Sequence, residues 1–507
     1  MKVWYVVAAL CAAVWSGGGV AQEAGYRLLE PVRDRSGHAL EQVDGQGRRL
    51  PVVRPVTDKA LESRIRAVLA QGVPALLPAL DEQARAASAY RPVCPAWQGG
   101  ITLYLSDDDG GYARQGLYVE TRPGQRALCT DSFIDITVDP TSLANGEFEE
   151  VLVHEYGHVL LRRLLGPVPA TPSRQAHAVF AVTDDVTAFD EGFGEHWQPV
   201  VARFTRNAGF RARVEGVAPP SAAELWLSRR DTWWREHGVP HNAFVFQPSV
   251  PAGAPDDAQR WLAAETSWPA DACRMKGGNA MMASEGVAAS FFYRLLGAGQ
   301  DPAALARRYA QLVPVLARMG RWPGRAPLVA LVHAWGEQYP RERKAVTQWF
   351  LASTYGATAS VAMHDQAESL SCLGARGKLG AFVPALKTFR HDADALLDQV
   401  VSGRLALDAA LAPPLWLASK DVRVSDQIGA SQPDQPLVVD LNTAEAPALQ
   451  WLLGDEMLVR RLLEARRQGG FRSLPDAVAR AKLSASQQAL LEEVSANYRA
   501  LPPYTRS

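Results

Sequence analysis

The 507-residue sequence predicts an α+β protein with more than one domain. Three observations support this fold class. Short runs rich in β-branched and aromatic residues, bounded by Gly and Asp turns, occur within 26–53 and 101–138 and predict strands. Apolar residues recur with helical spacing from about 147 onward and throughout 301–420. Residues 421–436 are rich in Ser, Asp, Gln and Pro and predict a linker to a last, all-α domain at 437–500.

Residues 1–21 are typical of a secretory signal peptide. Lys2 gives a positive start, the run from Val3 to Val14 is apolar, and small residues up to Ala21 offer a cleavage site before Gln22. This run is short for a membrane span, and the rest of the sequence has no stretch of about 18 apolar residues. We therefore expect an exported protein, periplasmic or secreted, with no transmembrane segment in the mature chain.

Removal of that peptide leaves four of the five cysteines, Cys94, Cys129, Cys273 and Cys372. An even number in an oxidising compartment allows two disulfides with three connectivities. Cys94 and Cys129 bracket one strand-rich stretch, which favours that pair and leaves Cys273 with Cys372. The spacing of these cysteines fits no zinc knuckle, so we do not expect a second metal site.

Residues 22–96 predict a mixed α/β region that precedes the main domain. Three short strands are expected at 26–32, 39–43 and 49–53, followed by helices at 59–69 and 76–87. Both a small domain and a propeptide fit this region.

The main domain is expected at 97–300 and begins with a small antiparallel sheet. Strands are predicted at 101–105, 116–121 and 133–138, with an acidic turn at 107–111. That turn lacks the ligand spacing of a calcium loop, which favours a solvated hairpin turn. An edge strand of such a sheet can hold an extended peptide through backbone hydrogen bonds.

A His-Glu-x-x-His motif at His154, Glu155 and His158 lies within a predicted helix. Acidic residues from Glu147 suit the positive end of the helix, and Gly166 ends it. Histidines four residues apart lie on one helix face and can bind one Zn²⁺, while Glu155 can take a proton from water whose pKa the metal lowers. Apolar residues on both sides indicate that the helix is buried, where such polar groups need partners.

The third metal ligand is expected on a second helix around 183–197. The metzincin continuation is excluded, because Leu occupies both positions at which that class has Gly and His. In the second helix Glu191 and Glu195 share a face. Gly192 and Gly194 allow another backbone to approach closely, as a site between two helices requires.

These two segments resemble the gluzincin metallopeptidases, the group that contains thermolysin-like enzymes and the M1 aminopeptidases. The shared residues are the motif at 154–158 and Asp-Glu-Gly-Phe-Gly at 190–194. The resemblance covers about 60 residues and implies a zincin-like catalytic domain. It also implies that Glu191 is the third ligand, that Glu155 is the general base and that Glu195 orients a zinc-bound histidine. Glu195 as the ligand is the alternative, and Glu285 is a further candidate.

A peptidase also needs a donor for the oxyanion that forms when water attacks a carbonyl. His237, His241 and Tyr293 are the candidates, and the sequence favours none of them. Residues 301–420 predict a helical subdomain that completes the far wall of the cleft.

Residues 437–500 resemble a helix-hairpin-helix domain of the competence DNA-receptor type. The resemblance rests on Asp-Leu-Asn-Thr-Ala at 440–444 and on the segment 462–477. Such domains hold phosphates on a Gly-x-Gly hairpin, but here the first hairpin has one glycine and two acids, and the second has no glycine. Basic and acidic residues balance, so we expect a protein-interaction or structural module and no nucleic-acid partner.

Together these observations predict an exported, zinc-dependent peptidase that acts on a peptide or protein substrate. Its metal ligands are His154, His158 and Glu191, and its general base is Glu155. Glu195 orients one of the zinc-bound histidines. The alternatives are a DNA-contacting envelope protein and a scaffold in which the zincin fold is not catalytic. The net charge of −1, with no long run of one sign, indicates no polyanionic partner.

Overall fold

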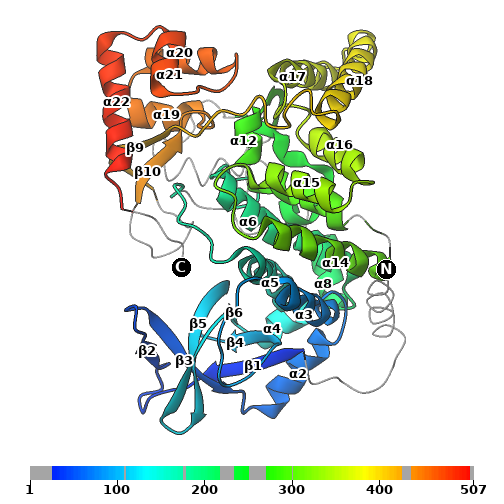
Figure 1. The fold of residues 1–507 in the computed structure, drawn as a ribbon, viewed down its shortest axis with the longest axis vertical. Helices are drawn as coiled ribbons and strands as arrows, with labels where there is room; N and C mark the ends of the chain where they lie inside the picture. Colours follow the sequence, from blue (N-terminus) through cyan, green and yellow to red (C-terminus); the bar gives the residue numbers. More distant parts are fainter. Residues whose placement is uncertain are drawn as a thin grey trace.

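The computed structural model describes residues 25–107, 110–174, 178–216, 233–249, 270–297, 299, 301–424 and 435–502. The predicted signal peptide at 1–21 and part of the acidic turn lie outside these residues. The chain is a mixed α and β structure, with the strands and first helices of the N-terminal 145 residues at one end and most of the later helices toward the other (Figure 1). The α+β class is therefore confirmed. In the described part of the chain, every helix is too short or too polar to cross a bilayer.

The first sheet is closed into a barrel. Its strands follow the order β1-β4-β6-β5-β3, and β1 pairs again with β3, while β2 is added outside β3. Three of the pairings, β1–β4, β4–β6 and β3–β5, are parallel. The strands are β1 (Tyr26–Pro31), β2 (Glu41–Val43), β3 (Arg49–Pro55), β4 (Ile101–Leu105), β5 (Gly111–Arg122) and β6 (Gln125–Ile136).

The expected small antiparallel sheet is therefore wrong, because the sheet is mixed and closed. β1 and β3 come from the region expected to be separate, and they pair with β4 and β5 across the boundary expected at residue 96. Closure pairs the strand edges that an open sheet would leave exposed. β5 is also longer than predicted, since Gly116, at φ +88°, absorbs a register shift and lets the strand continue through it.

The barrel packs against the helix that carries the His-Glu-x-x-His motif. This helix, α5, contacts β5 and β6 on one side and α3, α6, α7 and α14 on the others. The helices up to residue 216 are α2 (Lys59–Leu69), η1 (Pro74–Leu76), α3 (Leu77–Ala87), α4 (Pro140–Asn145), α5 (Glu147–Leu165), α6 (Asp185–Glu195), α7 (Trp197–Phe204) and α8 (Ala208–Gly216).

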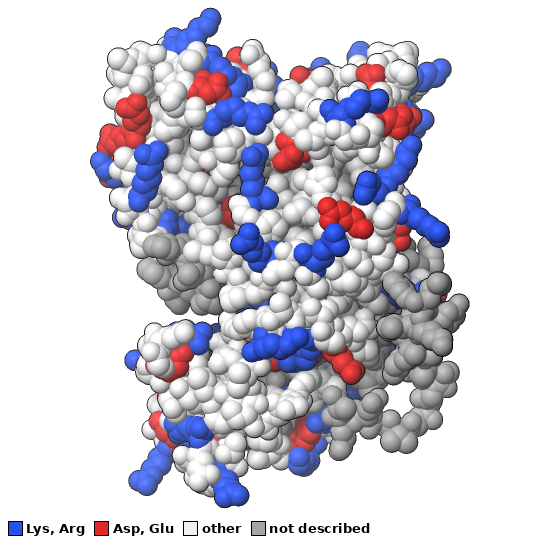
Figure 2. Space-filling view, viewed as in Figure 1, with Lys and Arg blue, Asp and Glu red and all other residues white. Residues whose placement is uncertain are grey.

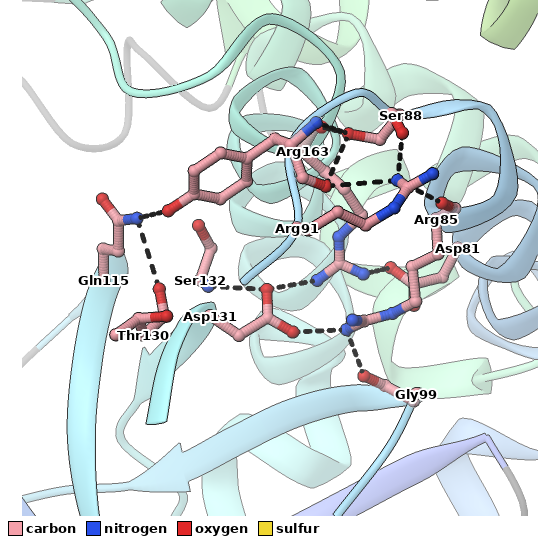
Figure 3. Close-up of polar contacts among 12 residues, drawn as sticks. Asp81, Arg85, Ser88, Arg91, Gly99, Gln115, Thr130, Asp131, Ser132 and Arg163 are labelled. Carbon is pink, nitrogen blue, oxygen red and sulfur yellow. Dashed lines mark hydrogen bonds and ion pairs between the residues drawn. The ribbon is translucent and has the colours of Figure 1, made fainter. Parts of the chain in front are cut away.

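A buried ion-pair network fixes the C-terminal half of α5 to its neighbours (Figure 3). Arg163 of α5 contacts Asp81 of α3 and lies 3.2 Å from Asp131 of β6, and Arg85 lies 2.8 and 2.6 Å from the same two carboxylates. Burial acts to lower the pKa of Arg163, but the two carboxylates outweigh it and raise the pKa above its ordinary value. The network therefore links α5, α3 and the barrel on the side of α5 away from its two motif histidines.

Short elements from Trp234 to Gly297 form part of a helical layer, in which they contact α6, α7 and the helices that follow. They are η2 (Trp234–Gly238), α10 (Val239–His241), η3 (Ala243–Val245), β7 (Phe246–Pro248), β8 (Ala270–Met275), α12 (Gly278–Met282), α13 (Glu285–Phe292) and η4 (Tyr293–Gly297). The layer continues as α14 (Pro302–Met319), α15 (Pro327–Gln338), α16 (Arg343–Ser353), α17 (Val361–Ala375) and α18 (Leu379–Val401). The predicted disulfides are confirmed as Cys94–Cys129 and Cys273–Cys372.

The C-terminal unit is not all-α. It begins with a hairpin of two antiparallel strands, β9 and β10, so both ends of the expected linker at 421–436 are strand, while 425–434 lie outside the described residues. The strands bury apolar side chains against the helices that follow, in a core of their own. The elements are β9 (Trp416–Val424), β10 (Gln435–Asp440), α19 (Ala446–Leu453), α20 (Glu456–Arg466), α21 (Leu474–Ala481) and α22 (Ala485–Arg499).

Candidate metal centre

Helix α5 presents the two motif histidines on one face. The helix begins after Gly146, whose φ of +81° turns the chain out of α4, and ends at Gly166, with acidic residues in the first turn and basic residues in the last turn. Most of its residues are buried, yet the side chain of His154 keeps 13% of its surface exposed and that of His158 keeps 6%. The site is thus inside the fold but reachable from solvent.

Helix α6 carries Glu191 to the same place. Asp184 caps its start by accepting hydrogen bonds from two backbone N–H groups, and two glycines let it approach its neighbours. A Cβ on Gly192 would lie 2.7 Å from a backbone oxygen of α13, and one on Gly194 would lie 2.8 Å from the ring of His154. The close approach predicted for both glycines is confirmed, because neither position has room for a side chain.

His154, His158 and Glu191 offer three ligand atoms that converge on one point. The two Nε2 atoms lie 3.2 Å apart, and an oxygen of Glu191 lies 3.8 Å from Nε2 of His154 and 3.5 Å from Nε2 of His158. Metal–ligand bonds of about 2.0–2.1 Å in a tetrahedral site place the ligand atoms roughly 3.3–3.4 Å apart. The three spacings are close to this value, so the group could hold a small divalent cation.

The charges around the triangle favour a cation as well. Burial acts to lower the pKa of His158, but Asp190 and Glu191 outweigh it and raise the pKa well above its ordinary value. The two neighbouring Nε2 atoms cannot both direct lone pairs at each other without repulsion. A positive charge between the two rings and the carboxylate relieves that repulsion and compensates the negative charges of Asp190 and Glu191.

Asp190 is the partner that sequence reasoning missed. Its Oδ1 lies 2.9 Å from Nδ1 of His158, so that Nδ1–H can donate to the carboxylate while Nε2 faces the triangle. Its only signal in the sequence was its place next to Glu191. Glu195, for which this supporting role was predicted, is buried one turn farther along α6, and that role stays a prediction.

Glu155 lies beside the triangle and is only 7% exposed. Burial raises the pKa of Glu155 to about 7; Glu191 also raises it, while His158, Arg162 and the backbone N–H of Ala113 hold it down. That N–H donates to the carboxylate, and Arg162 donates to the carbonyl oxygen of Ala113. The backbone N–H and C=O of one residue of β5 are thus held by the general-base candidate and by an arginine one turn after His158.

The first half of β5 has one edge without a strand partner among the described residues. Gly111 to Gln115 pair with β6, whereas β3 pairs with β5 only at Tyr118 and Val119. Gly111 lies against α5, where a Cβ would come within 3.2 Å of Cγ of Glu155. The open edge therefore runs past the carboxylate beside the metal triangle.

The remaining candidates lie in other surroundings. Glu285 is fully buried at the start of α13 and is not part of the three-ligand group found among the described residues. His237 stacks on Trp233 with ring centroids 5.3 Å apart, and His241 is exposed in α10. Tyr293 begins η4, which contacts α7 and α13. None of the last three is brought to the triangle by these contacts, and the oxyanion donor stays unassigned.

Comparison of the chain with protein-family models, with curated proteins and with solved structures found no match.

Proposed function

We propose that this protein is an exported, zinc-dependent peptidase of the zincin type. The observation that carries the proposal is the triangle of two imidazoles and one carboxylate at near-tetrahedral spacing, with the Glu155 carboxylate beside it. Two histidines and a glutamate are the ligand set of catalytic zinc sites that keep a fourth position open. When bound there, zinc supplies Lewis-acid chemistry, lowering the pKa of water and polarising a carbonyl.

A structural zinc site fits these residues less well. Structural sites are usually closed by four protein ligands, whereas the group found among the described residues has three. Glu155 is a further carboxylate beside the triangle, and it is engaged by Ala113 and Arg162 on the side of β5. This arrangement favours a catalytic site over the scaffold alternative.

Glu155 is suited to the role of general base. A group that takes and returns a proton works best with a pKa near the operating pH, and burial raises the pKa of Glu155 to about 7. The Ala113 N–H and the Arg162 charge fix the orientation of the carboxylate and oppose a further rise. Asp190 holds His158 in the tautomer that a metal ligand requires.

The substrate class that fits the site is an extended peptide. In the part of the chain that the structure describes, the edge of β5 beside Glu155 has no strand partner in its first half. Outside Ala113, whose N–H and C=O are engaged by Glu155 and Arg162, this edge can bind an extended segment through main-chain hydrogen bonds whatever its side chains. In this arrangement the substrate chain lies along Gly111 to Gln115, and a peptide bond passes over the metal triangle. Two disulfides fit a protein that works in an oxidising compartment.

The C-terminal unit supports this proposal over the DNA-contacting alternative. At the first hairpin the Asp455 carboxylate accepts from the N–H of Leu458, where a phosphate-binding hairpin would leave its amides for the ligand. Arg472 and Arg480 donate to backbone carbonyls of their own chain. We assign this unit to protein contact or to structural support.

The Glu155→Gln variant tests the proposal, with Glu147→Gln as the matched control because Glu147 is exposed on the same helix. All three proteins are analysed for zinc by elemental mass spectrometry and incubated with a mixed-sequence peptide library. We expect about one zinc per chain in each, and hydrolysis that falls about 100- to 10,000-fold only in Glu155→Gln. The proposed metal site would be refuted if elemental analysis found no zinc in the unaltered protein. Zinc with equal hydrolysis in both variants would refute the mechanism.

A further inference from the structure

The helical hairpin α17–α18 projects from the helical layer at the corner farthest from the barrel (Figure 1). Its two helices pack on each other, and α17 also packs on β8. Between Ala367 and Leu396 no residue is buried. Phe389 and Ala393 of α18 pack against the hydrophobic core, whereas the start of α18 and the turn before it lie outside that core.

The outer end of this hairpin exposes large apolar side chains. Leu379 is 69% exposed and Val383 is 50% exposed, and they are two of the five large hydrophobic residues exposed in the described chain. The two are four residues apart on α18, so they lie on one face of the first turn. Exposed apolar side chains that cluster in this way mark interaction sites more often than single ones do.

The same end is cationic. The segment 369–391 contains no Asp or Glu, and it contains Arg376, Lys378, Lys387 and Arg390. All four are exposed, and Figure 2 shows basic side chains along the edge of this corner, with acidic ones among them farther in. The nearest acids in sequence are engaged at the base of the hairpin, where Glu368 accepts from the N–H of Met275 and Asp392 accepts from Gln366. No carboxylate within the segment neutralises its cations.

Helix α17 is held firmly to β8 along its length. His364 in its first turn contacts the carbonyl of Met275, and Cys372 in its last turn is bonded to Cys273, two residues earlier in β8. The disulfide therefore fixes the end of α17 from which the chain turns into the exposed start of α18. An anchored arm with an apolar, basic end can present that end to a surface without loss of the fold.

We propose that the outer end of α17–α18 binds the surface of an anionic lipid bilayer. Leu379 and Val383 enter the interfacial layer, and the cations of the segment contact lipid phosphates. Lys387 follows Val383 by one helical turn, about 6 Å along the axis, which places its ammonium at headgroup depth when Val383 lies in the acyl boundary.

The observations favour a bilayer over a protein partner. A stable protein interface buries about 800 Å² on each side, which is far more than two apolar side chains and a helical turn offer. The basic residues are spread over the outer end of the hairpin. This distribution suits a continuous anionic surface, because each basic residue then contributes independently to binding. A second copy of the chain carries the same positive charge at this end and would be repelled.

The test uses the processed chain, residues 22–507, because the apolar leader would itself bind lipid. Binding is measured by sedimentation with large vesicles of phosphatidylglycerol and phosphatidylethanolamine, and with vesicles of phosphatidylcholine alone. We expect association only with the anionic vesicles, and at least tenfold weaker binding in 0.5 M salt than in 0.1 M salt.

Two variants separate the two contributions. Lys378→Gln with Lys387→Gln removes two charges, and we expect about fivefold weaker binding per charge. Leu379→Ser with Val383→Ser removes the apolar contact, and we expect at least tenfold weaker binding. The controls Val43→Ser and Arg122→Gln alter an equally exposed valine and arginine on the barrel and should bind as the unaltered protein does.

The proposal is overturned if anionic vesicles do not sediment the protein, if neutral vesicles bind it equally, or if the barrel controls weaken binding as much as the tip variants. It is also overturned if sedimentation velocity shows a dimer that Leu379→Ser with Val383→Ser dissociates, since the face would then join two copies. Circular dichroism of every variant confirms that these exposed substitutions leave the fold intact. The measurement does not depend on peptidase activity.

Discussion

Replacement of Asp190 tests the proposed metal site through a residue that contacts His158 but is not itself one of the three ligands. The carboxylate lies 2.9 Å from Nδ1 of His158 and takes no place in the three-atom triangle. In Asp190→Ala, Nδ1–H loses its acceptor, so the ring can rotate or carry its proton on Nε2, where a metal needs a lone pair. In Asp190→Asn an uncharged oxygen can still accept, so the orientation is kept and only the charge is lost.

The expected magnitudes differ between the two variants. A hydrogen bond to a charged group contributes about 1.5–3 kcal/mol, and one between neutral groups contributes about 0.5–1.5 kcal/mol. Complete loss in Asp190→Ala therefore predicts zinc binding roughly 10- to 150-fold weaker. Loss of the charge alone in Asp190→Asn predicts a change of about fivefold to tenfold. This graded order is the signature of an orienting carboxylate.

Zinc affinity is measured by competition with a chromophoric chelator at pH 7, so the result does not depend on peptidase activity. Asp185→Asn is the control, because Asp185 lies on the same helix but accepts from the N–H of Ala326. Glu195→Gln tests the competing assignment for the same role. If Asp190→Ala binds zinc within twofold of the unaltered protein while Glu195→Gln binds it tenfold more weakly, the role belongs to Glu195 and our reasoning is wrong.

Three further predictions follow from other parts of the structure. Gly194→Ala puts a Cβ 2.8 Å from the ring of His154, a proposed zinc ligand, and should weaken zinc binding at least tenfold. Gly380→Ala, which has open space around it, should leave zinc binding unchanged. Burial lowers the pKa of His196 to about 3, so below pH 6.5 this histidine binds a proton in the unfolded chain but not in the folded chain. Between pH 7 and 5 the free energy of unfolding should therefore fall by about 2 kcal/mol more in the unaltered protein than in His196→Gln. Urea unfolding at the two pH values measures this difference. An equal fall in both would contradict the assignment. Arg163→Met leaves two carboxylates of a buried network without one of their partners and should lower the free energy of unfolding by about 3–5 kcal/mol. The control Arg318→Met removes an ion pair that is about half exposed and should lower the free energy of unfolding by less than about 1 kcal/mol. Equal losses in thermal or urea unfolding would show that the network does not stabilise the fold.

The sequence alone determined the features that depend on local spacing. His154 and His158 face the same way because residues four apart on a helix always do, and the helix was predictable from its ends and its apolar neighbours. Glu191 was proposed from a short motif, and the glycines beside it from the need for close packing. The two disulfides followed from an even cysteine count and the position of the strands.

Only the tertiary structure decided which groups meet across long stretches of chain. Asp190 against His158 and Ala113 against Glu155 join residues on different elements, and nothing in their spacing along the chain indicates the contact. The same holds for β1 and β3, whose short strands read as a separate region until their pairing with β4 and β5 closed the barrel. Periodicity tells which face of an element is apolar. The partner of that face is chosen by packing of the whole chain, because burial energy depends on area and not on sequence distance.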